Sequence, residues 1–185
     1  AGYVPSSEYY DRVYHGSWNA LTVISLSIGQ GELGCTPLQM ANFAAILANR
    51  GYYYIPHIVK RIEGRDSIDR RFYEKQYTMI DPKHFEPIVD GMWRGVNVGG
   101  TSMLARLEGL DVCGKTGTAE RADENGGYLK ENYMSSFMGF APAQSPKVLC
   151  YITLDGTPSG SDAAAVPFQS IMANALDVLG IPHTK

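Results

Sequence analysis

Between residues 111 and 154 the chain alternates between segments that predict strands and short polar or proline-rich connections. The three expected strands cover approximately residues 111–120, 135–140 and 147–154. The connection "RADENGGYL" is polar and rich in glycine, whereas "APAQSP" is short and contains two prolines. Such connections suit turns between antiparallel strands, because these residues favour the backbone angles and local hydrogen bonds of turns. The pattern predicts an antiparallel sheet built from the end of the chain.

Helical spacing of apolar residues predicts helices that flank this sheet. In "TPLQMANFAAILANRG", Thr36 is expected to cap a helix and to form a capping box with Gln39. A second helix is expected in "DPKHFEPIVDGMWRGVN", a shorter one over Thr101–Leu107 and a final one over Ala163–Leu179. The expected inner faces of the first two helices comprise Met40, Phe43, Ala44 and Leu47, and Phe85, Ile88, Val89, Met92 and Trp93.

The remaining segments have weaker patterns. Residues 1–20 are aromatic and polar and predict a loop, and "LTVISLSIGQGE" predicts a short strand that enters a tight turn. The charged segment Glu63–Thr78 predicts a surface excursion that is compatible with a hairpin. Together the segments predict an α/β (α+β) fold, in which helices are segregated from an antiparallel sheet.

Composition excludes several functional classes. The net charge of −3 offers no basic stripe for phosphates, so we expect no nucleic-acid partner. No run approaches the ~20 apolar residues of a membrane span. The three cysteines, Cys35, Cys113 and Cys150, fit no metal motif, and we expect Cys113 and Cys150 to be small buried apolar residues. The sequence therefore predicts neither a metal nor a cofactor.

Lys115 belongs to a segment that resembles a phosphate-binding loop. "GLDVCGKT" matches the pattern G-x-x-x-x-G-K-[ST] letter for letter. Such a loop must follow a strand and open a helix, whose N-terminal N–H groups hold the phosphates. The segment before it, "TSMLARLE", instead has a helical pattern, and "GTAERADENGG" after it is rich in turn-forming residues. Nucleotide binding is therefore the alternative interpretation rather than the favoured one.

Lys115 also begins "KTG", the signature of serine-acylating penicillin-binding proteins and β-lactamases. Such a lysine is expected on an edge strand that lines a cleft, where it supplies positive charge. Thr116 and Thr118 supply hydroxyls for a substrate carboxylate, and Gly117 keeps the strand surface open to a peptide. An extended peptide can pair with such an edge by strand addition.

Several blocks together resemble class B penicillin-binding proteins. "SIGQGELGCTPLQMANFAAILANRG", "PHIVKRI", "DGMWRGVN", "GGTS", "GKTGTAE" and "SSFMGFAP" occur in the order seen in that family. The opening "YVPSSEYYDRVYHGSWNALTVISLSIGQGE" is most similar to the elongation-type penicillin-binding protein 2 group. The blocks span most of the chain, and their common order favours the penicillin-binding interpretation over the phosphate loop.

The resemblance implies a peptidoglycan D,D-transpeptidase of the serine type, without a cofactor. Such enzymes form an acyl-serine intermediate with a D-Ala-D-Ala stem peptide, release D-alanine and pass the acyl group to an amine. By this similarity, Lys115 supports the hydrogen-bond network around the nucleophile, while Thr116 and Thr118 bind the terminal carboxylate of the peptide or of a β-lactam. The backbone N–H of Thr118 then supplies one oxyanion donor. Lys115 and Thr118 are thus the expected catalytic residues, and Lys115, Thr116, Gly117 and Thr118 the substrate-binding set.

The other half of such a site should carry Ser-x-x-Lys and then Ser-x-Asn or Ser-x-Asp. No lysine of this chain has a serine three positions before it. "SWN", Ser17 to Asn19, matches Ser-x-Asn, but the family has its motif further upstream, so we interpret this match as chance. The resemblance therefore implies a single partial domain over residues 1–185, the C-terminal half of a transpeptidase domain. We expect the isolated chain to be inactive and to associate through an unpaired edge of its last strand.

The resemblance also implies a setting for the parent protein. Its partners would be peptidoglycan stem peptides, β-lactams, the missing N-terminal half of the domain and a lipid-linked glycan polymerase. It would act in cell-shape and cell-wall synthesis on the periplasmic side of the bacterial inner membrane, anchored outside this chain. A carboxypeptidase, a class A synthase and a β-lactam sensor of the same fold remain open alternatives, as does a binding module without chemistry.

Overall fold

The computed structural model describes residues 2–65, 67–122, 128–158 and 162–183. The backbone divides into two compact units, Ala1–Gln39 and Met40–Lys185, and each is described by itself. The expectation of a single partial domain over residues 1–185 stays a prediction.

The first unit contains two short helices where we predicted a loop and a strand. These are α1 (Ser7–Val13) and α2 (Ala20–Ser27), so the loop prediction was wrong over Ser7–Val13 and the strand prediction was wrong, whereas the turn predicted after it is present. The cause is local capping: the side chain of Ser6 accepts a hydrogen bond from the backbone N–H of Tyr9 at 3.2 Å, and that of Asn19 accepts one from Leu21 at 2.9 Å. The alternation of apolar and polar residues in α2 indicated a strand, but the Asn19 cap favours the start of a helix at this point.

A tyrosine pair on α1 holds the carboxylate of Glu32 in this unit. The hydroxyl of Tyr10 donates to one carboxylate oxygen at 2.8 Å, and the hydroxyl of Tyr14 donates to the other. Desolvation and the contact with Glu32 raise the pKa of Tyr10 to about 12. Trp18 donates to Asp11 at 2.7 Å. With Asn19 capping α2, two residues of the "SWN" match therefore have structural partners inside the unit.

The capping box at the start of α3 (Pro37–Ala48) is confirmed. Gln39 accepts a hydrogen bond from the backbone N–H of Thr36 at 2.9 Å, and the Thr36 hydroxyl accepts one from the backbone of Gln39 at 3.2 Å. The predicted inner face was half right. The buried residues of α3 are Ala44, Leu47 and Ala48, whereas Phe43 is 46% exposed.

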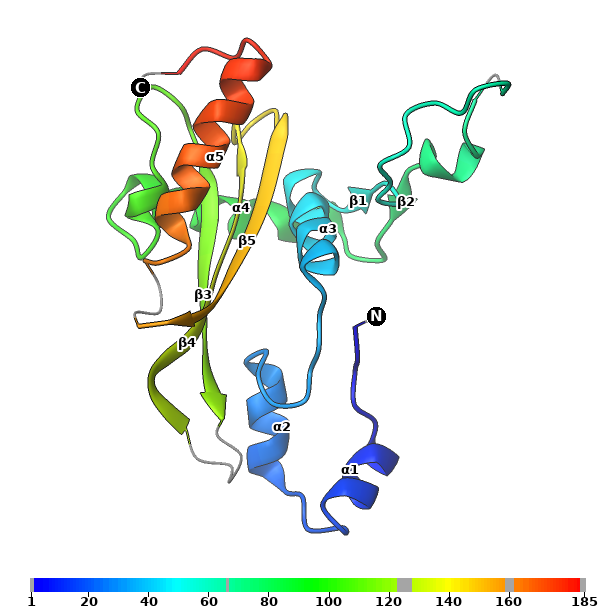
Figure 1. Ribbon diagram of the computed structural model, residues 1–185, viewed down its shortest axis with the longest axis vertical. Coiled ribbons are helices and arrows are strands. Elements are labelled where there is room, and N and C mark those ends of the chain that lie inside the picture. Colours follow the sequence, from blue (N-terminus) through cyan, green and yellow to red (C-terminus); the bar gives the residue numbers. More distant parts are fainter. Residues whose placement is uncertain (1, 66, 123–127, 159–161, 184–185) are drawn as a thin grey trace. The chain divides into compact units, whose positions relative to one another are not determined.

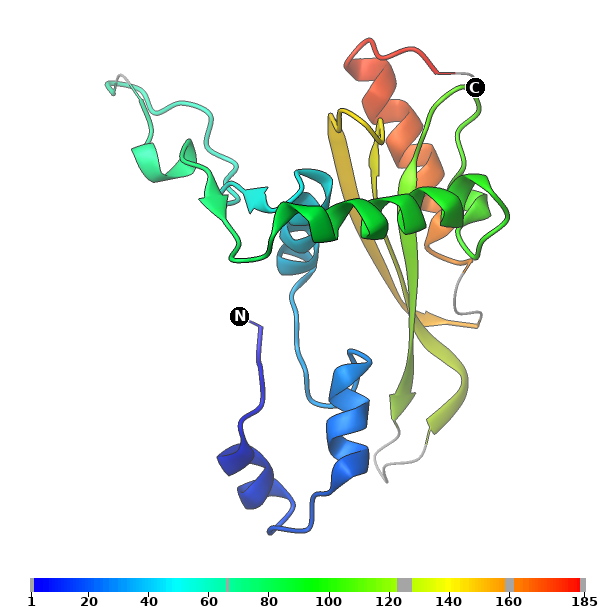
Figure 2. The ribbon, with the colours of Figure 1, turned by 180° about the vertical axis from the view of Figure 1, so that it is seen from behind.

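The predicted excursion in the middle of the chain is confirmed, with a hairpin at its base. β1 (Tyr52–Tyr53) pairs antiparallel with β2 (Gln76–Tyr77), and between them lies one 3-10 turn, η1 (Arg70–Phe72). Figures 1 and 2 show this segment extending away from the sheet of the second unit.

Helix α4 (Phe85–Asn97) follows a 3-10 turn, η2 (Pro82–His84), as predicted for this segment. Its buried stripe consists of Phe85, Val89, Met92 and Val96. Ile88 was expected inside but is 47% exposed, because the stripe that contacts the core is narrower than predicted. The predicted short helix over Thr101–Leu107 is reduced to the 3-10 turn η3 (Met103–Ala105).

The predicted antiparallel sheet is confirmed. It contains β3 (Cys113–Ala122), β4 (Tyr128–Ala141) and β5 (Val148–Thr157), in that spatial order. The predicted start of the middle strand was too late, because Ala122 already pairs with Tyr128. The first residues of β4 are largely polar in sequence, so no apolar pattern indicated a strand there. Backbone hydrogen bonds between strands do not require apolar side chains.

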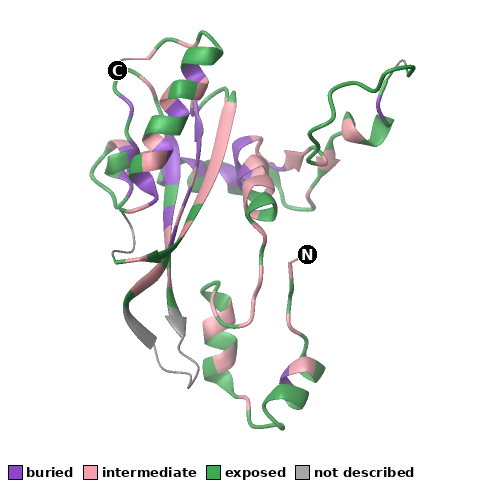
Figure 3. Ribbon diagram, viewed as in Figure 1, coloured by how far each residue is buried: buried purple, intermediate pink, exposed green. Residues whose placement is uncertain are grey.

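Helices cover both faces of the sheet. Figures 1 and 2 show α5 (Ala165–Val178) on one face and α4 on the other. On the α5 side, Phe137 packs with Phe168 and Met172, whereas on the α4 side Phe140 packs with Phe85 and Val89. Figure 3 shows the buried residues gathered where the helices cover the strands.

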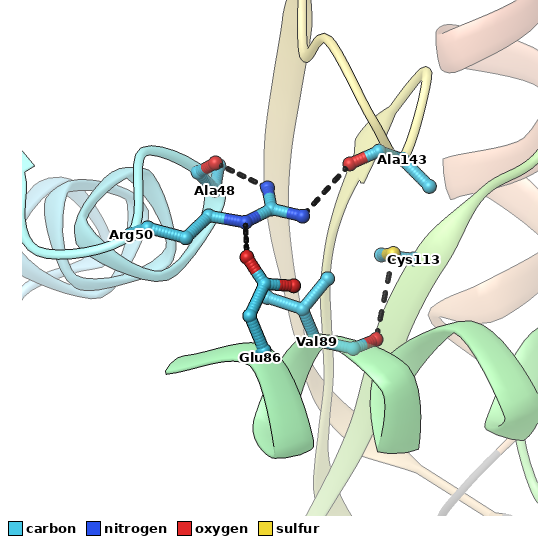
Figure 4. A network of polar contacts seen from close by, with 6 residues as sticks. All are labelled: Ala48, Arg50, Glu86, Val89, Cys113 and Ala143. Atoms are coloured by element: carbon cyan, nitrogen blue, oxygen red, sulfur yellow. Dashed lines mark hydrogen bonds and ion pairs between the residues drawn. The ribbon is translucent and has the colours of Figure 1, made fainter. Parts of the chain in front are cut away.

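Arg50 joins three separate parts of the second unit (Figure 4). Its guanidinium donates to the carbonyl of Ala48 at 2.7 Å, to the carbonyl of Ala143 at 3.3 Å and to the carboxylate of Glu86 at 3.1 Å. The end of α3, the first turn of α4 and the connection after β4 are thereby held together. The Arg50 side chain is 18% exposed, so these charge-assisted contacts are partly screened from water.

Candidate functional site

The four residues of "KTGT" lie in the middle of β3, which is an edge strand of the described sheet. Lys115 pairs with Met138, Thr116 with Phe137, Gly117 with Ser136 and Thr118 with Ser135. Because only β4 pairs with β3 among the described strands, the other side of β3 presents backbone groups that a ligand could use. The predicted placement of this motif on an edge strand is confirmed.

The structure places Lys115 and the two threonines on opposite faces of β3. Side chains alternate along a strand, so Lys115 shares the face of Cys113 and α4, whereas Thr116 and Thr118 share the face of Phe137 and α5. The Lys115 side chain is exposed, and its ammonium donates to the carbonyl of Thr116 in the same strand at 2.6 Å. A peptide lying along the edge would meet groups from both faces.

Thr116 and Thr118 differ in their surroundings. Thr116 is 8% exposed, and its hydroxyl oxygen lies 3.4 Å from the hydroxyl oxygen of Thr101. Thr118 is exposed, and its cross-strand partner Ser135 is buried. The role of these hydroxyls in binding a carboxylate stays a prediction.

Gly117 lies against the side chain of Ser136. A Cβ atom built on Gly117 would come within 2.4 Å of the Ser136 hydroxyl oxygen. A larger residue would thus force this serine to move, and it would also cover the surface beside the strand edge. The role of Gly117 in leaving the strand surface open to a peptide stays a prediction.

Contacts with α4 fix the start of β3. The side-chain amide of Asn97 donates to the carbonyls of Trp93 and Val112, at 2.8 and 2.9 Å, and the Trp93 indole donates to Asp111 at 2.8 Å. The buried Cys113 thiol donates to the carbonyl of Val89 at 3.7 Å. Burial raises the pKa of Cys113 to about 12, which suits a packing residue rather than a nucleophile.

Sequence reasoning missed several residues that shape this site. Asn97 fastens α4 to β3, Thr101 reaches Thr116, and Gly114 lies opposite Gly139 in the ladder. The sequence singles out Thr101 only by its place in "GGTS" and as the first residue of the helix expected over Thr101–Leu107, and neither indicates a contact with Thr116. None of these contacts follows from spacing along the chain.

The phosphate-loop alternative is not supported by the backbone. Residues after Lys115 continue as strand β3 to Ala122, so no helix N-terminus follows Thr116 to hold phosphates. Within the described residues there is also no cluster of three or more histidine, cysteine or acidic side chains that could hold a metal. In the same part of the chain, no helix is long and apolar enough to cross a membrane.

Comparison with known families identifies one match. The model of the penicillin binding protein transpeptidase domain matches residues 8–173. Among curated proteins, stage V sporulation protein D of Bacillus subtilis (strain 168) is 32% identical over 167 residues, covering 86% of this chain and 25% of that protein. Peptidoglycan D,D-transpeptidase MrdA of Haemophilus influenzae is 33% identical over 187 residues, covering 93% of this chain and 28% of that protein.

Solved structures give a consistent result. The crystal structure of Pseudomonas aeruginosa PBP2 in complex with WCK 5153 matches with a TM-score of 0.73 at 30% identity, covering 97% of this chain and 38% of that one. Penicillin binding protein 3 from Mycobacterium tuberculosis, complexed with ampicillin, has a TM-score of 0.73 at 27% identity, covering 100% of this chain and 42% of that one. The chain thus spans between 16% and 40% of the length of the first curated relatives.

Proposed function

Because the chain belongs to the family of penicillin-binding protein transpeptidase domains, we propose that it forms one wall of the acyl-transfer site of a peptidoglycan D,D-transpeptidase. The observation that carries this proposal is the position of "KTGT" on an edge strand. There Lys115, Thr116 and Thr118 lie on a strand whose other side has no pairing strand within the described sheet. The names of the relatives support the same activity.

The proposed roles follow from the chemistry of these groups. Threonine hydroxyls on a strand that also carries an ammonium group suit a substrate carboxylate, because charge-assisted hydrogen bonds are stronger than neutral ones. A free N–H on the edge of β3 suits the oxyanion of a tetrahedral intermediate. In this proposal Thr116 and Thr118 bind the terminal carboxylate of a stem peptide or β-lactam, while Lys115 stabilises the charged network around a serine nucleophile.

The serine and its lysine base would come from a Ser-x-x-Lys that this chain does not contain. We therefore place this chain in the C-terminal half of the domain, in an elongation-type protein that works on the periplasmic side of the inner membrane. A membrane anchor outside this chain and a lipid-linked glycan polymerase as partner belong to the same proposal. β-Lactam binding is supported by the solved relatives that carry aztreonam and ampicillin.

The proposal is tested by substitution in a protein that carries the complete domain, including this chain. Thr118→Val should slow acylation by ampicillin about 10-fold or more, because a hydrogen bond to a charged group is lost. Thr153→Val is the matched control, since Thr153 is an exposed threonine on β5 at the far side of the sheet. Equal acylation rates for Thr118→Val, Lys115→Ala and the control would contradict the proposed site.

A further inference from the structure

Thr101 lies outside β3, but its hydroxyl lies close to the hydroxyl of Thr116, which belongs to β3. Their oxygens lie 3.4 Å apart, and Thr101 is exposed whereas Thr116 is 8% exposed. Thr101 belongs to the turn between α4 and η3, and 14 residues lie between the two threonines in the sequence. The pair is therefore a product of the fold, and it lies at the residue to which the proposed function assigns carboxylate binding.

The turn that carries Thr101 is closely attached to α4. A Cβ atom built on Gly100 would come within 2.5 Å of the Gly95 Cα and 2.7 Å of the Gly95 carbonyl oxygen, so the two glycines touch. The backbone N–H of Ser102 donates to the carbonyl of Gly95 at 3.1 Å, and Ser102 is buried. Gly99 has a φ of 98°, which glycine adopts without strain. The backbone on both sides of Thr101, at Gly100 and at Ser102, is thus held against α4.

We propose that Thr101 is a positioning residue, which orients the Thr116 hydroxyl toward the terminal carboxylate of the substrate. A threonine hydroxyl has one donor and two acceptor positions. When the Thr101 hydroxyl donates to the Thr116 oxygen, the single proton of Thr116 is directed away from Thr101 and can point to a ligand carboxylate. Donation to Thr116 also polarises its hydroxyl and strengthens the hydrogen bond that it makes.

This inference rests on the proposed function, because it assumes that Thr116 binds a carboxylate. It goes beyond that function in naming the group that directs Thr116. A structural role for Thr101 would make a different prediction, namely that its loss changes stability but does not distinguish between ligands with and without a carboxylate.

The test uses a protein that carries the complete domain, with benzylpenicillin and its methyl ester as probes. Thr101→Val should slow acylation by benzylpenicillin about 2- to 10-fold, the worth of one neutral hydrogen bond. It should leave acylation by the ester within twofold, since the ester has no carboxylate for Thr116 to bind. Thr101→Ser keeps the hydroxyl and should restore the wild-type preference for the acid. Thr101→Ala is measured beside Thr101→Val, so that the added methyl group of valine is not mistaken for loss of the hydroxyl.

The variant Thr116→Val separates this inference from the proposed function. The double variant Thr101→Val/Thr116→Val should be no slower than Thr116→Val alone, because Thr101 acts through Thr116. A slow Thr116→Val with unchanged Thr101→Val and Thr101→Ala overturns the role of Thr101 and leaves the proposed function intact. An unchanged Thr116→Val overturns both. Equal slowing of acid and ester by Thr101→Val also overturns the positioning role.

Discussion

At the scale of single residues, two opposed glycines shape the sheet beneath the proposed site. Gly114 on β3 pairs with Gly139 on β4, and neither has room for a side chain. A Cβ atom on Gly139 would come within 2.6 Å of the Phe168 ring, and one on Gly114 within 2.4 Å of the Phe137 ring. The two rings lie with their centroids 4.5 Å apart. The glycine pair thus leaves room for the Phe137 and Phe168 rings between the sheet and α5. This close packing lies at the residue immediately before Lys115.

Gly114→Ala should therefore destabilise the chain by about 1–3 kcal/mol, the usual cost of adding a methyl group to a well-packed core. Thermal or urea unfolding measures the change. Gly91→Ala is the matched control, because Gly91 is exposed on α4 and has no atom within 4 Å of its built Cβ. In a helix this control should gain about 0.5–1 kcal/mol. Equal stability of the two variants would contradict the packing argument.

At the scale of elements, the last strand has an unpaired side. In the described sheet β5 pairs with β4 only. The first half of β5, from Val148 to Ile152, is apolar except for Tyr151. Edge strands of this kind offer free N–H and carbonyl groups to another chain. The predicted association of the isolated chain has this structural basis, and it stays a prediction.

The isolated chain should therefore form dimers or larger species in light scattering. Thr153→Lys places a charge on the exposed part of β5 and should shift the chain toward monomer, as edge lysines do in natural sheets. Ser170→Lys adds the same charge on the exposed side of α5 and should leave association unchanged. A monodisperse wild-type monomer at high concentration would contradict association through the unpaired side of β5.

At the scale of the whole molecule, the chain belongs to a transpeptidase domain family but spans only part of its relatives. It has the strand with "KTGT" and no Ser-x-x-Lys in its sequence. In the proposed function acylation needs both, because an edge strand can donate hydrogen bonds to an oxyanion but cannot itself attack a β-lactam carbonyl.

The isolated chain should therefore carry no covalent label after incubation with a fluorescent penicillin, denaturation and gel electrophoresis. A protein with the complete domain is the positive control in the same gel. A fluorescent band that survives denaturation at the position of the isolated chain would show that a nucleophile is present in it after all.

Much of the fold and of the candidate site was predictable because the signals are local. The capping box of Thr36 and Gln39, the helix at Phe85–Asn97 and the strands joined by glycine- and proline-rich connections depend on neighbours a few positions apart. The position of "KTGT" on an edge strand was predicted from its similarity to the KTG signature, and the strand order confirms it. Where local signals competed, as in Ala20–Ser27, a side-chain cap overruled an apparent strand pattern.

The sequence by itself determined the family resemblance, the antiparallel sheet and the residues of the proposed binding strand. Only the tertiary structure decided that the face of Lys115 is the one packed against α4 and the face of Thr116 the one packed against α5, that the hydroxyls of Thr101 and Thr116 lie close together and that Gly114 pairs with Gly139. These relations depend on strand register and on how closely α4 and α5 pack against the sheet. They join residues that are distant along the chain, whereas propensities, caps and turn chemistry act only between near neighbours.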